Sequence, residues 1–199
     1  GSGSTSAIMV RKLGEAVGQG LSIKGVASSD ATARLAQEVG IPLISLEEAI
    51  TLDINIDGAD EFNPDMQLIK GGGGALLREK ILAHNSKFNV IIADSGKQVK
   101  RLGAFKLPVE IIPFAAKPIF AELDGIGLKP QLRQHDGVIY STDENNHILD
   151  LDILGWEDVQ ELERKLKSIP GIVETGLFLD STDLIILGKG ERTVLIKKS

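Results

Sequence analysis

The sequence contains no cysteine, and aromatic residues make up only 4% of its 199 residues. The absence of cysteine excludes disulfides, thiolate zinc sites and a cysteine nucleophile, and it suits a reducing compartment such as the cytoplasm. Because aromatic side chains are scarce, the core must be built mainly from Ile, Leu, Val and Ala. With 42% apolar and 25% charged residues, the composition is nevertheless that of a globular protein.

Long apolar runs and an excess of basic residues are missing as well. No apolar segment approaches the ~20 residues that span a bilayer, and no charged segment followed by an apolar one opens the chain. The net charge of −6 argues against nucleic acid and anionic membranes as partners, because both attract basic surfaces. The histidines, His84, His135 and His147, have no metal-ligand spacing. We therefore expect no nucleic-acid or membrane partner, no metal site and no cofactor.

The first half of the chain alternates predicted strands and helices. Strands are expected at 21–27, 52–56, 66–69 and 88–94, and helices at about 30–39 and 75–84. Ser28, Ser29 and Asp30 offer N-caps for the first helix, and Gly40 offers its end. The continuous apolar run at 88–94 is typical of a strand that is buried on both faces. The pattern predicts a Rossmann-like α/β fold, a mostly parallel sheet with helices on both faces.

From about residue 108 the order of elements changes to βαβββαβ. The predicted elements are a strand at VEIIP, a helix at 115–123, strands at 129–134, at 137–142 and up to about 152, a helix at about 156–167 and a strand at GIVETGLFL. This order predicts a small α+β, ferredoxin-like domain with an antiparallel sheet. Apolar segments at 184–187 and 193–196 predict a hairpin that returns to the first domain. We therefore expect an α/β catalytic domain over 1–107 and 178–199, and a small domain over 108–177.

An acidic cluster follows the predicted strand 52–56. Asp53 to Gly58 match the opening of a calcium loop, but the twelfth position of such a loop needs a carboxylate and here it is Pro64. What is left is Asp57-Gly58-Ala59-Asp60-Glu61, a set of carboxylates at the end of a strand. Crowded carboxylates are suited to proton transfer near neutral pH. Taken alone, a solvated acidic turn explains the segment equally well.

A glycine run, Gly71 to Gly74, follows Lys70 between an apolar strand and a helix-forming segment. Each glycine costs backbone entropy, so the run indicates a loop that needs positive φ or a close approach to a ligand. Amide groups at the start of the next helix, with Lys70 beside them, would face an anion or a polarised oxygen. The alternative is a flexible connection with an incidental lysine.

Two further charged residues stand where they could reach a ligand. In the helix 75–84, Leu77 and Ile81 form the expected apolar face, so Glu79 should point away from the core. Lys97 follows the strand 88–94, at the carboxyl edge where open α/β sheets bind ligands. Each of the two residues, taken singly, is also typical of an ordinary protein surface.

Together these segments resemble the ribose-5-phosphate isomerase A family. The resemblance rests on Asp57-Gly58-Ala59-Asp60-Glu61, Lys70-Gly71-Gly72-Gly73, Arg78-Glu79-Lys80 and Lys97-Gln98-Val99, and it extends through LPVEIIP, ILDLDI and IPGIVETGLF. Gly1-Ser2-Gly3-Ser4-Thr5 is similar to the Gly-Thr-Gly-Ser-Thr turn of that family, although an expression tag has the same appearance. The family's usual first helix and first strand, which would precede this turn, are not in the printed sequence.

The resemblance implies an activity and roles for these residues. Family members interconvert ribose 5-phosphate and ribulose 5-phosphate through a cis-enediolate, a step of the non-oxidative pentose phosphate pathway. Glu79 would be the general base between C2 and C1, and Lys70 with the glycine amides would stabilise the negative oxygen. Asp57 would assist ring opening, and Asp60 would hold hydroxyl groups. The implied substrate-binding set is Ser2, Gly3, Ser4, Thr5, Asp57, Gly58, Ala59, Asp60, Lys70, Gly71, Gly72, Gly73 and Lys97.

Two other functions compete with this one. The first is a related sugar-phosphate isomerase or deaminase on a similar fold, and the second is a non-catalytic sensor of sugar phosphates. A sensor would have no use for a base at Glu79 beside Lys70, and it would normally carry a DNA-binding module, of which the acidic chain shows no sign. The resemblance also implies a homo-oligomer, a dimer or a tetramer.

Overall fold

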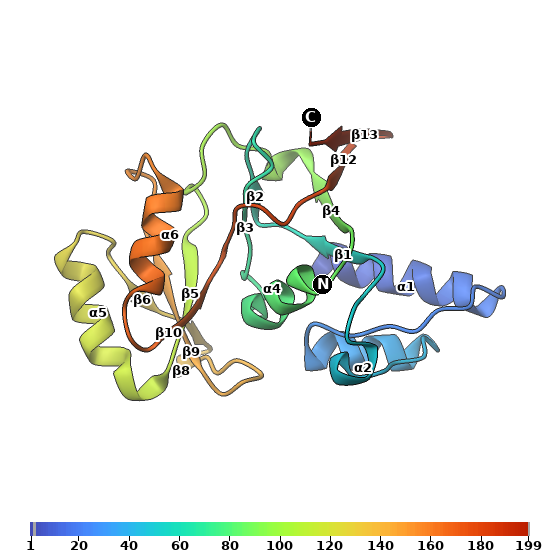
Figure 1. Ribbon diagram of the computed structural model, residues 1–199, viewed down its shortest axis with the longest axis horizontal. Coiled ribbons are helices and arrows are strands. Elements are labelled where there is room, and N and C mark those ends of the chain that lie inside the picture. Colours follow the sequence, from blue (N-terminus) through green and yellow to red (C-terminus); the bar gives the residue numbers. More distant parts are fainter. Residues whose placement is uncertain (2, 199) are drawn as a thin grey trace. The chain divides into compact units, whose positions relative to one another are not determined.

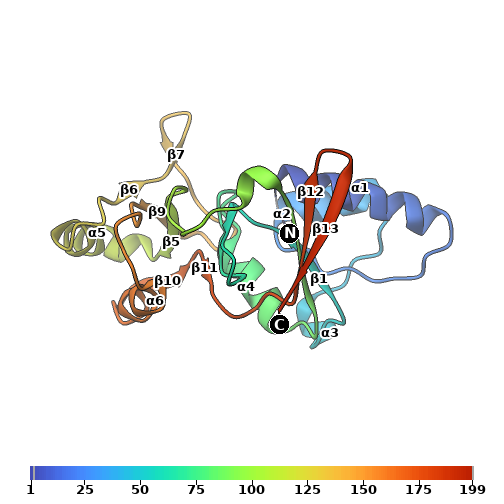
Figure 2. The same ribbon diagram turned by 90° about the horizontal axis from the view of Figure 1, so that it is seen from above.

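The computed structural model describes residues 1 and 3–198, and Ser2 and Ser199 lie outside the described part. The chain forms two compact units, whose elements are drawn in Figure 1 and, from above, in Figure 2. Unit 1 comprises residues 1–58, 78–95 and 181–199, and unit 2 comprises residues 59–77 and 96–180. The domain boundaries expected from the sequence stay a prediction, because these units are defined by packing alone.

Unit 1 is built on a mostly parallel sheet with the strand order β1-β4-β12-β13. Its strands are β1 (Asn55–Gly58), β4 (Asn89–Asp94), β12 (Leu184–Lys189) and β13 (Arg192–Lys197). β4 lies between β1 and β12 and is parallel to both, whereas β13 returns antiparallel to β12 as the expected hairpin. Val90, Ile91 and Ala93 of β4 are buried, as its continuous apolar sequence predicts. The expected α/β class is confirmed.

The helices of unit 1 are α1 (Ser4–Gly18), α2 (Asp30–Glu38), α3 (Leu46–Ala49) and α4 (Leu76–His84), of which α4 begins in unit 2. α1 packs against β1 and β4, and α2 packs against α1 (Figure 1). The hydroxyl of Ser29 caps α2 by accepting the amide of Thr32 at 3.1 Å, and Gly40 follows the helix with a φ of 77°. The strand expected at 21–27 is wrong in extent, because this extended segment forms only a single bridge, from Gly25 to Leu43.

Unit 2 contains an antiparallel sheet with the strand order β10-β5-β9-β6. Its elements follow one another as β5 (Leu107–Ile111), η2 (Pro113–Ala115), α5 (Ala116–Gly125), β6 (Gln131–Leu132), β9 (His147–Leu151), α6 (Val159–Lys167) and β10 (Ile172–Thr175). Without the short η2 and the separate hairpin described below, this is the βαββαβ order of the expected ferredoxin-like fold, with one strand fewer than the predicted βαβββαβ. The predicted strands at 129–134 and 137–142 are shorter than expected, because the chain makes a separate hairpin there from β7 (Gln134–His135) and β8 (Val138–Ile139).

The core of unit 2 lies between this sheet and both of its helices (Figure 1). Leu162 and Leu166 of α6 are spaced i,i+4 and are completely buried, together with Leu123 of α5. The carboxylate of Asp158 caps α6 by accepting two backbone amides at 2.9 Å. The amphipathic sequence of α6 therefore predicts its buried face correctly.

A small antiparallel sheet with the order β11-β3-β2 frames the glycine run in unit 2. Its strands are β2 (Glu61–Phe62), β3 (Leu68–Ile69) and β11 (Leu177–Phe178). Lys70 follows β3 directly, and its backbone amide donates to the carbonyl of Gly176 at 2.9 Å. The short helix η1 (Ser95–Lys97) follows β4, and the amide of Val99 donates to the carbonyl of Phe62 at 2.9 Å.

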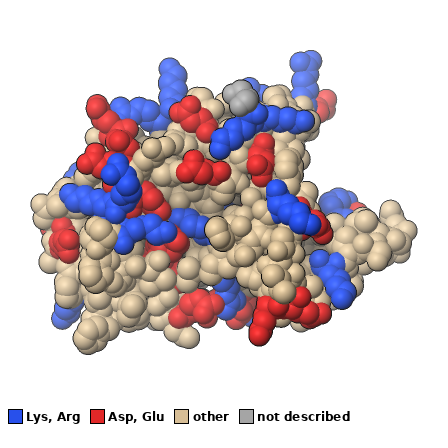
Figure 3. Space-filling view, in the orientation of Figure 1, with Lys and Arg blue, Asp and Glu red and all other residues tan. Residues whose placement is uncertain are grey.

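The surface carries charges of both signs. On the face drawn in Figure 3, Lys and Arg side chains are interspersed with Asp and Glu. None of the helices in the described part of the chain is long and apolar enough to cross a membrane. The described residues also include no cluster of His, Asp and Glu arranged to hold a metal ion.

Candidate active site

Asp57 lies in β1 of unit 1 and is almost completely buried, with a 1% exposed side chain. Its Oδ1 accepts the backbone amide of Gly58 at 2.7 Å, and the amino group of Gly1 lies 3.9 Å from the same oxygen. A carboxylate is buried at a large desolvation penalty unless polar partners surround it. Asp57 therefore does not belong to a solvated acidic turn, the alternative that the sequence left open.

Gly1 lies next to Asp57. A Cβ atom at Gly1 would fall 1.9 Å from Oδ1 of Asp57, so the close approach of these two residues requires glycine. Gly3 is the N-cap of α1 with a φ of 99°, and Ser4 and Thr5 are exposed in its first turn. The first amides of a helix and its dipole favour an anion, so this end of α1 suits a phosphate group. Ser2, which the sequence also assigned to phosphate binding, lies outside the described residues.

Glu79 on α4 is buried, with a 3% exposed side chain, whereas Ile81 is 41% exposed. The expectation that Leu77 and Ile81 form the buried face and that Glu79 points away from it is wrong. The buried face instead contains Leu76, Glu79 and Leu82, spaced i, i+3 and i+6. The prediction assumed that the buried face of a helix is apolar, so it could not identify a buried face that includes a carboxylate. Such burial is rare for glutamate and marks this residue as a candidate for chemistry.

The glycine run in unit 2 is shaped by its contacts with Asp60. The amide of Gly72 donates to Oδ2 of Asp60 at 2.7 Å, and a Cβ atom at Gly72 would fall 2.6 Å from Oδ1 of the same carboxylate. Gly71 and Gly74 have φ values of 102° and 82°, which other residues rarely adopt. The run therefore combines positive φ with close approach, the two reasons for glycine that the sequence suggested.

Lys70 is buried in unit 2 just before these glycines, with a 3% exposed side chain. Its ammonium group lies 5.3 Å from the centre of the Phe178 ring, within reach of a cation–π interaction. Burial of an ammonium group is as unusual as burial of a carboxylate, so an incidental surface lysine is excluded. Lys97, in η1, is half-buried.

Glu61, the third carboxylate of the acidic cluster, has a structural role in unit 2. Its oxygens accept the backbone amides of Gly103 at 2.8 Å and of Phe105 at 2.5 Å. These charge-assisted bonds hold the loop before β5. Asp57, Asp60 and Glu61 are therefore neighbours in sequence that make separate sets of contacts.

Two residues that the sequence did not single out contact the glycine run within unit 2. The guanidinium of Arg133 donates to the carbonyls of Gly71 at 2.8 Å and Gly72 at 3.2 Å, and the hydroxyl of Tyr140 lies 3.4 Å from the carbonyl of Gly73. Each residue lies more than 60 positions after the glycines that it contacts. No short-range sequence signal connects them to it.

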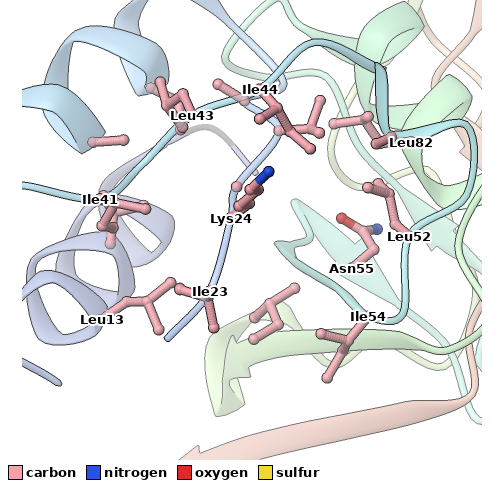
Figure 4. Close-up of a pocket in the computed structure, with 18 of the residues that line it drawn as sticks. Leu13, Ile23, Lys24, Ile41, Leu43, Ile44, Leu52, Ile54, Asn55 and Leu82 are labelled. Carbon is pink, nitrogen blue, oxygen red and sulfur yellow. The ribbon is translucent and has the colours of Figure 1, made fainter. Parts of the chain in front are cut away.

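A cavity of about 610 Å³ lies in unit 1, and none of the predicted catalytic residues lines it. Figure 4 shows that its walls are mostly apolar side chains, among them Leu13, Ile41 and Leu52, and labels two of the polar lining residues, Lys24 and Asn55. Neither Asp57 nor Glu79 lines it. A sugar phosphate needs many polar partners, so this cavity does not fit such a substrate.

Comparison with known proteins gives consistent matches over almost the whole chain. Residues 24–192 match the family described as Ribose 5-phosphate isomerase A (phosphoriboisomerase A). A protein of Ruegeria pomeroyi named Ribose-5-phosphate isomerase A is 50% identical over 99% of this chain and 78% of its own length. A protein of the same name from Listeria monocytogenes is 48% identical over 100% of this chain and 89% of its own.

Solved structures agree with these matches. Ribose 5-phosphate isomerase A of Methanocaldococcus jannaschii has a TM-score of 0.93 and 36% identity, over 99% of this chain and 88% of that one. A D-ribose-5-phosphate isomerase in complex with phospho-erythronic acid has a TM-score of 0.95 and 36% identity, over 100% of this chain and 89% of that one. The family resemblance of the sequence motifs is confirmed, and the chain belongs to the ribose 5-phosphate isomerase A family.

Proposed function

We propose that this protein is an enzyme that interconverts ribose 5-phosphate and ribulose 5-phosphate. The observation that carries the proposal is the burial of Glu79, the residue that corresponds to the family's general base. Burial of a glutamate is rare, because a charged group loses its hydration when it leaves water. In the isomerisation that the family catalyses, this carboxylate would serve as the general base.

In the proposed reaction Glu79 removes the proton from C2 of the open-chain aldose. The electron pair of the broken C2–H bond forms the C1–C2 double bond of a cis-enediolate, and O1 takes the negative charge. The proton then returns to C1, while the proton of the 2-hydroxyl group moves to O1 and leaves the ketone at C2. Asp57 serves this last transfer and the opening of the sugar ring. A positioned base of this kind contributes about 10²–10⁴ in rate.

Lys70 and the glycine amides stabilise the negative charge that develops on O1. A buried ammonium group is effective here because no water screens it, and such donors are worth about 10²–10³ in rate. Asp60 holds hydroxyl groups of the sugar while its other oxygen keeps the amide of Gly72 in place. Gly58 and Ala59, between the two aspartates, complete the sugar site.

The phosphate group binds at the N-terminal end of α1 in this proposal. Gly3, Ser4 and Thr5 supply amides and hydroxyl groups there, as expected of Ser2 as well. Lys97 adds a positive charge to the substrate site. No metal ion or organic cofactor is required for these steps, because proton transfers and one fixed cation account for them.

The test is to incubate the purified protein with ribose 5-phosphate and a chelator and to measure ribulose 5-phosphate. Product is expected in the presence of the chelator. No product, with or without added metal ions, would contradict the proposal. Release of ammonia from an amino-sugar phosphate would identify the deaminase alternative, and tight binding of sugar phosphates without turnover would identify the sensor.

We further infer that the enzyme works in the cytoplasm as a homodimer or homotetramer. The lack of cysteine supports the first inference. The second is supported by β13, which is the last strand of its sheet and exposes Val194 and Leu195 by 42% and 58%. Light scattering after size-exclusion chromatography would measure the mass, and a monomer at micromolar concentration would contradict the second inference.

A further inference from the structure

Side chains from other parts of unit 2 hold the glycine run through a network of hydrogen bonds that starts at Asp150 of β9. Nε of Arg133 donates to Oδ2 of Asp150 at 2.9 Å, and Nη2 makes a second, short contact with Oδ1. This two-pronged pair fixes the plane of the guanidinium group, which a lysine cannot imitate. Both side chains are largely buried, with 14% and 19% exposed, so the pair is not a solvated surface ion pair.

The remaining nitrogen of Arg133, Nη1, reaches the carbonyls of Gly71 and Gly72. Tyr140 adds its hydroxyl near the carbonyl of Gly73, and the backbone amide of Tyr140 donates to the carbonyl of Arg133 at 2.9 Å. Arg133 and Tyr140, the two residues that hold the run, are thus hydrogen-bonded to each other. A Cβ atom at Gly74 would fall 2.2 Å from the Tyr140 hydroxyl, so the close contact of this network requires glycine.

Two backbone amides of the run already have partners within unit 2. The amide of Gly72 donates to Asp60, and the amide of Gly74 donates to the carbonyl of Gly71 at 2.9 Å. The amide of Gly73 has no partner among the residues that the structure describes. It shares a peptide plane with the carbonyl of Gly72, and in a trans peptide the two groups point in opposite directions. A donor that holds this carbonyl therefore also aims the amide of Gly73.

We propose that Arg133 is a positioning residue that aims the amide of Gly73 at the oxyanion of the enediolate. The inference rests on the isomerase function proposed above. Arg133 acts through the backbone and does not itself contact the sugar. Asp150 fixes the guanidinium, and Tyr140 holds the next carbonyl. The arrangement supplies a preorganised donor of the kind that stabilises developing negative charge.

The test compares the variants Arg133→Lys and Arg101→Lys. Arg133→Lys keeps the positive charge and loses the planar guanidinium group with its several donors. The value of kcat/KM should fall by about 10²-fold, the loss typical of a catalytic group that is misplaced by about 1 Å. The side chain of Arg101 is exposed and, among the described residues, donates to the carbonyl of Trp156 alone, at 3.2 Å, so its variant should match the parent protein. In Arg133→Ala, added guanidinium ion should restore part of the rate with saturation.

Inhibition constants separate a positioning role from a merely structural one, because they do not depend on the fraction of active enzyme. Phospho-erythronic acid carries a carboxylate in place of the reacting carbonyl, whereas ribitol 5-phosphate carries only a neutral hydroxyl group there. In Arg133→Lys the inhibition constant of the acid should rise by about the same factor as kcat/KM falls, while that of ribitol 5-phosphate stays unchanged.

Other outcomes would overturn the proposal. If kcat falls with both inhibition constants unchanged, Arg133 only maintains the fold. If both constants rise together, Arg133 supports general substrate binding and not the oxyanion. A parent protein that makes no ribulose 5-phosphate would refute the proposed function instead, and calorimetric binding of the two ligands to the parent and to Arg133→Lys would still test the aim of the amide.

Discussion

The helices α4 and α6 are alike in length and differ in what they bury. Each has 9 residues and an apolar pattern with helical spacing. α6 buries Leu162 and Leu166, the leucines that its sequence predicts, whereas α4 buries Glu79 and exposes Ile81. The apolar pattern therefore predicts the buried face correctly in α6, which only builds a core. It fails in α4, which buries a charged residue, and the catalytic role proposed for Glu79 would account for that charge.

The largest expected effect is on turnover. Glu79→Gln removes the proposed base and keeps its shape, so kcat should fall by about 10²–10⁴-fold while KM changes little. The matched control is Glu161→Gln on α6, an exposed glutamate in the first turn of that helix, which should leave kcat unchanged. Steady-state rates with ribose 5-phosphate measure both. Comparable turnover of Glu79→Gln and the parent would show that another group moves the proton.

The second effect is on stability, and it separates the apolar residues of the two helices. Leu162→Ala on α6 should lower the free energy of unfolding by about 2–5 kcal/mol, because it leaves a cavity in the core of unit 2. Ile81→Ala on α4 should lower it by no more than about 0.5 kcal/mol, because the side chain is partly in solvent. Urea unfolding followed by circular dichroism measures both values. Equal losses would mean that Ile81 is buried after all.

The smallest effect concerns Glu110 in β5, another buried glutamate, which the proposed mechanism does not use. Burial raises the pKa of Glu110, although Thr142 and Asn146 partly oppose the shift by donating hydrogen bonds to Oε1 at 2.9 and 3.0 Å. The folded protein therefore keeps this proton to a higher pH than the unfolded chain does. The resulting stability is present at low pH and is lost as the pH rises through the folded-state pKa.

Glu110→Gln keeps the acceptor oxygen and removes the titration. Relative to the parent, this variant should gain stability as the pH is raised from about 4 to 7, and its kcat should not change. Melting temperatures across this range measure the first expectation. If the melting temperature of the variant depends on pH as that of the parent does, Glu110 is not the titrating group. If kcat falls, Glu110 contributes to turnover, as is proposed for Glu79.

Local patterns account for most of the fold. The apolar run of β4, the caps Ser29 and Asp158 and the leucines of α6 each act within a few residues of the chain, so their sequence signals lead directly to the observed elements. The strand at 21–27 does not follow its pattern. A segment becomes a strand only when neighbouring strands pair with it, and this segment pairs with its neighbour at a single bridge.

Residue types at fixed spacing predict the family, the α/β and ferredoxin-like folds and the motifs that carry Asp57, Lys70 and Glu79, so these features can be read from the sequence alone. The tertiary structure decided which charges are buried, that Glu61 holds a loop, and that Arg133 and Tyr140 support the glycine run. Burial and hydrogen bonding join residues that are far apart in the chain. A pattern among residues that are close in sequence therefore does not identify these distant contact partners.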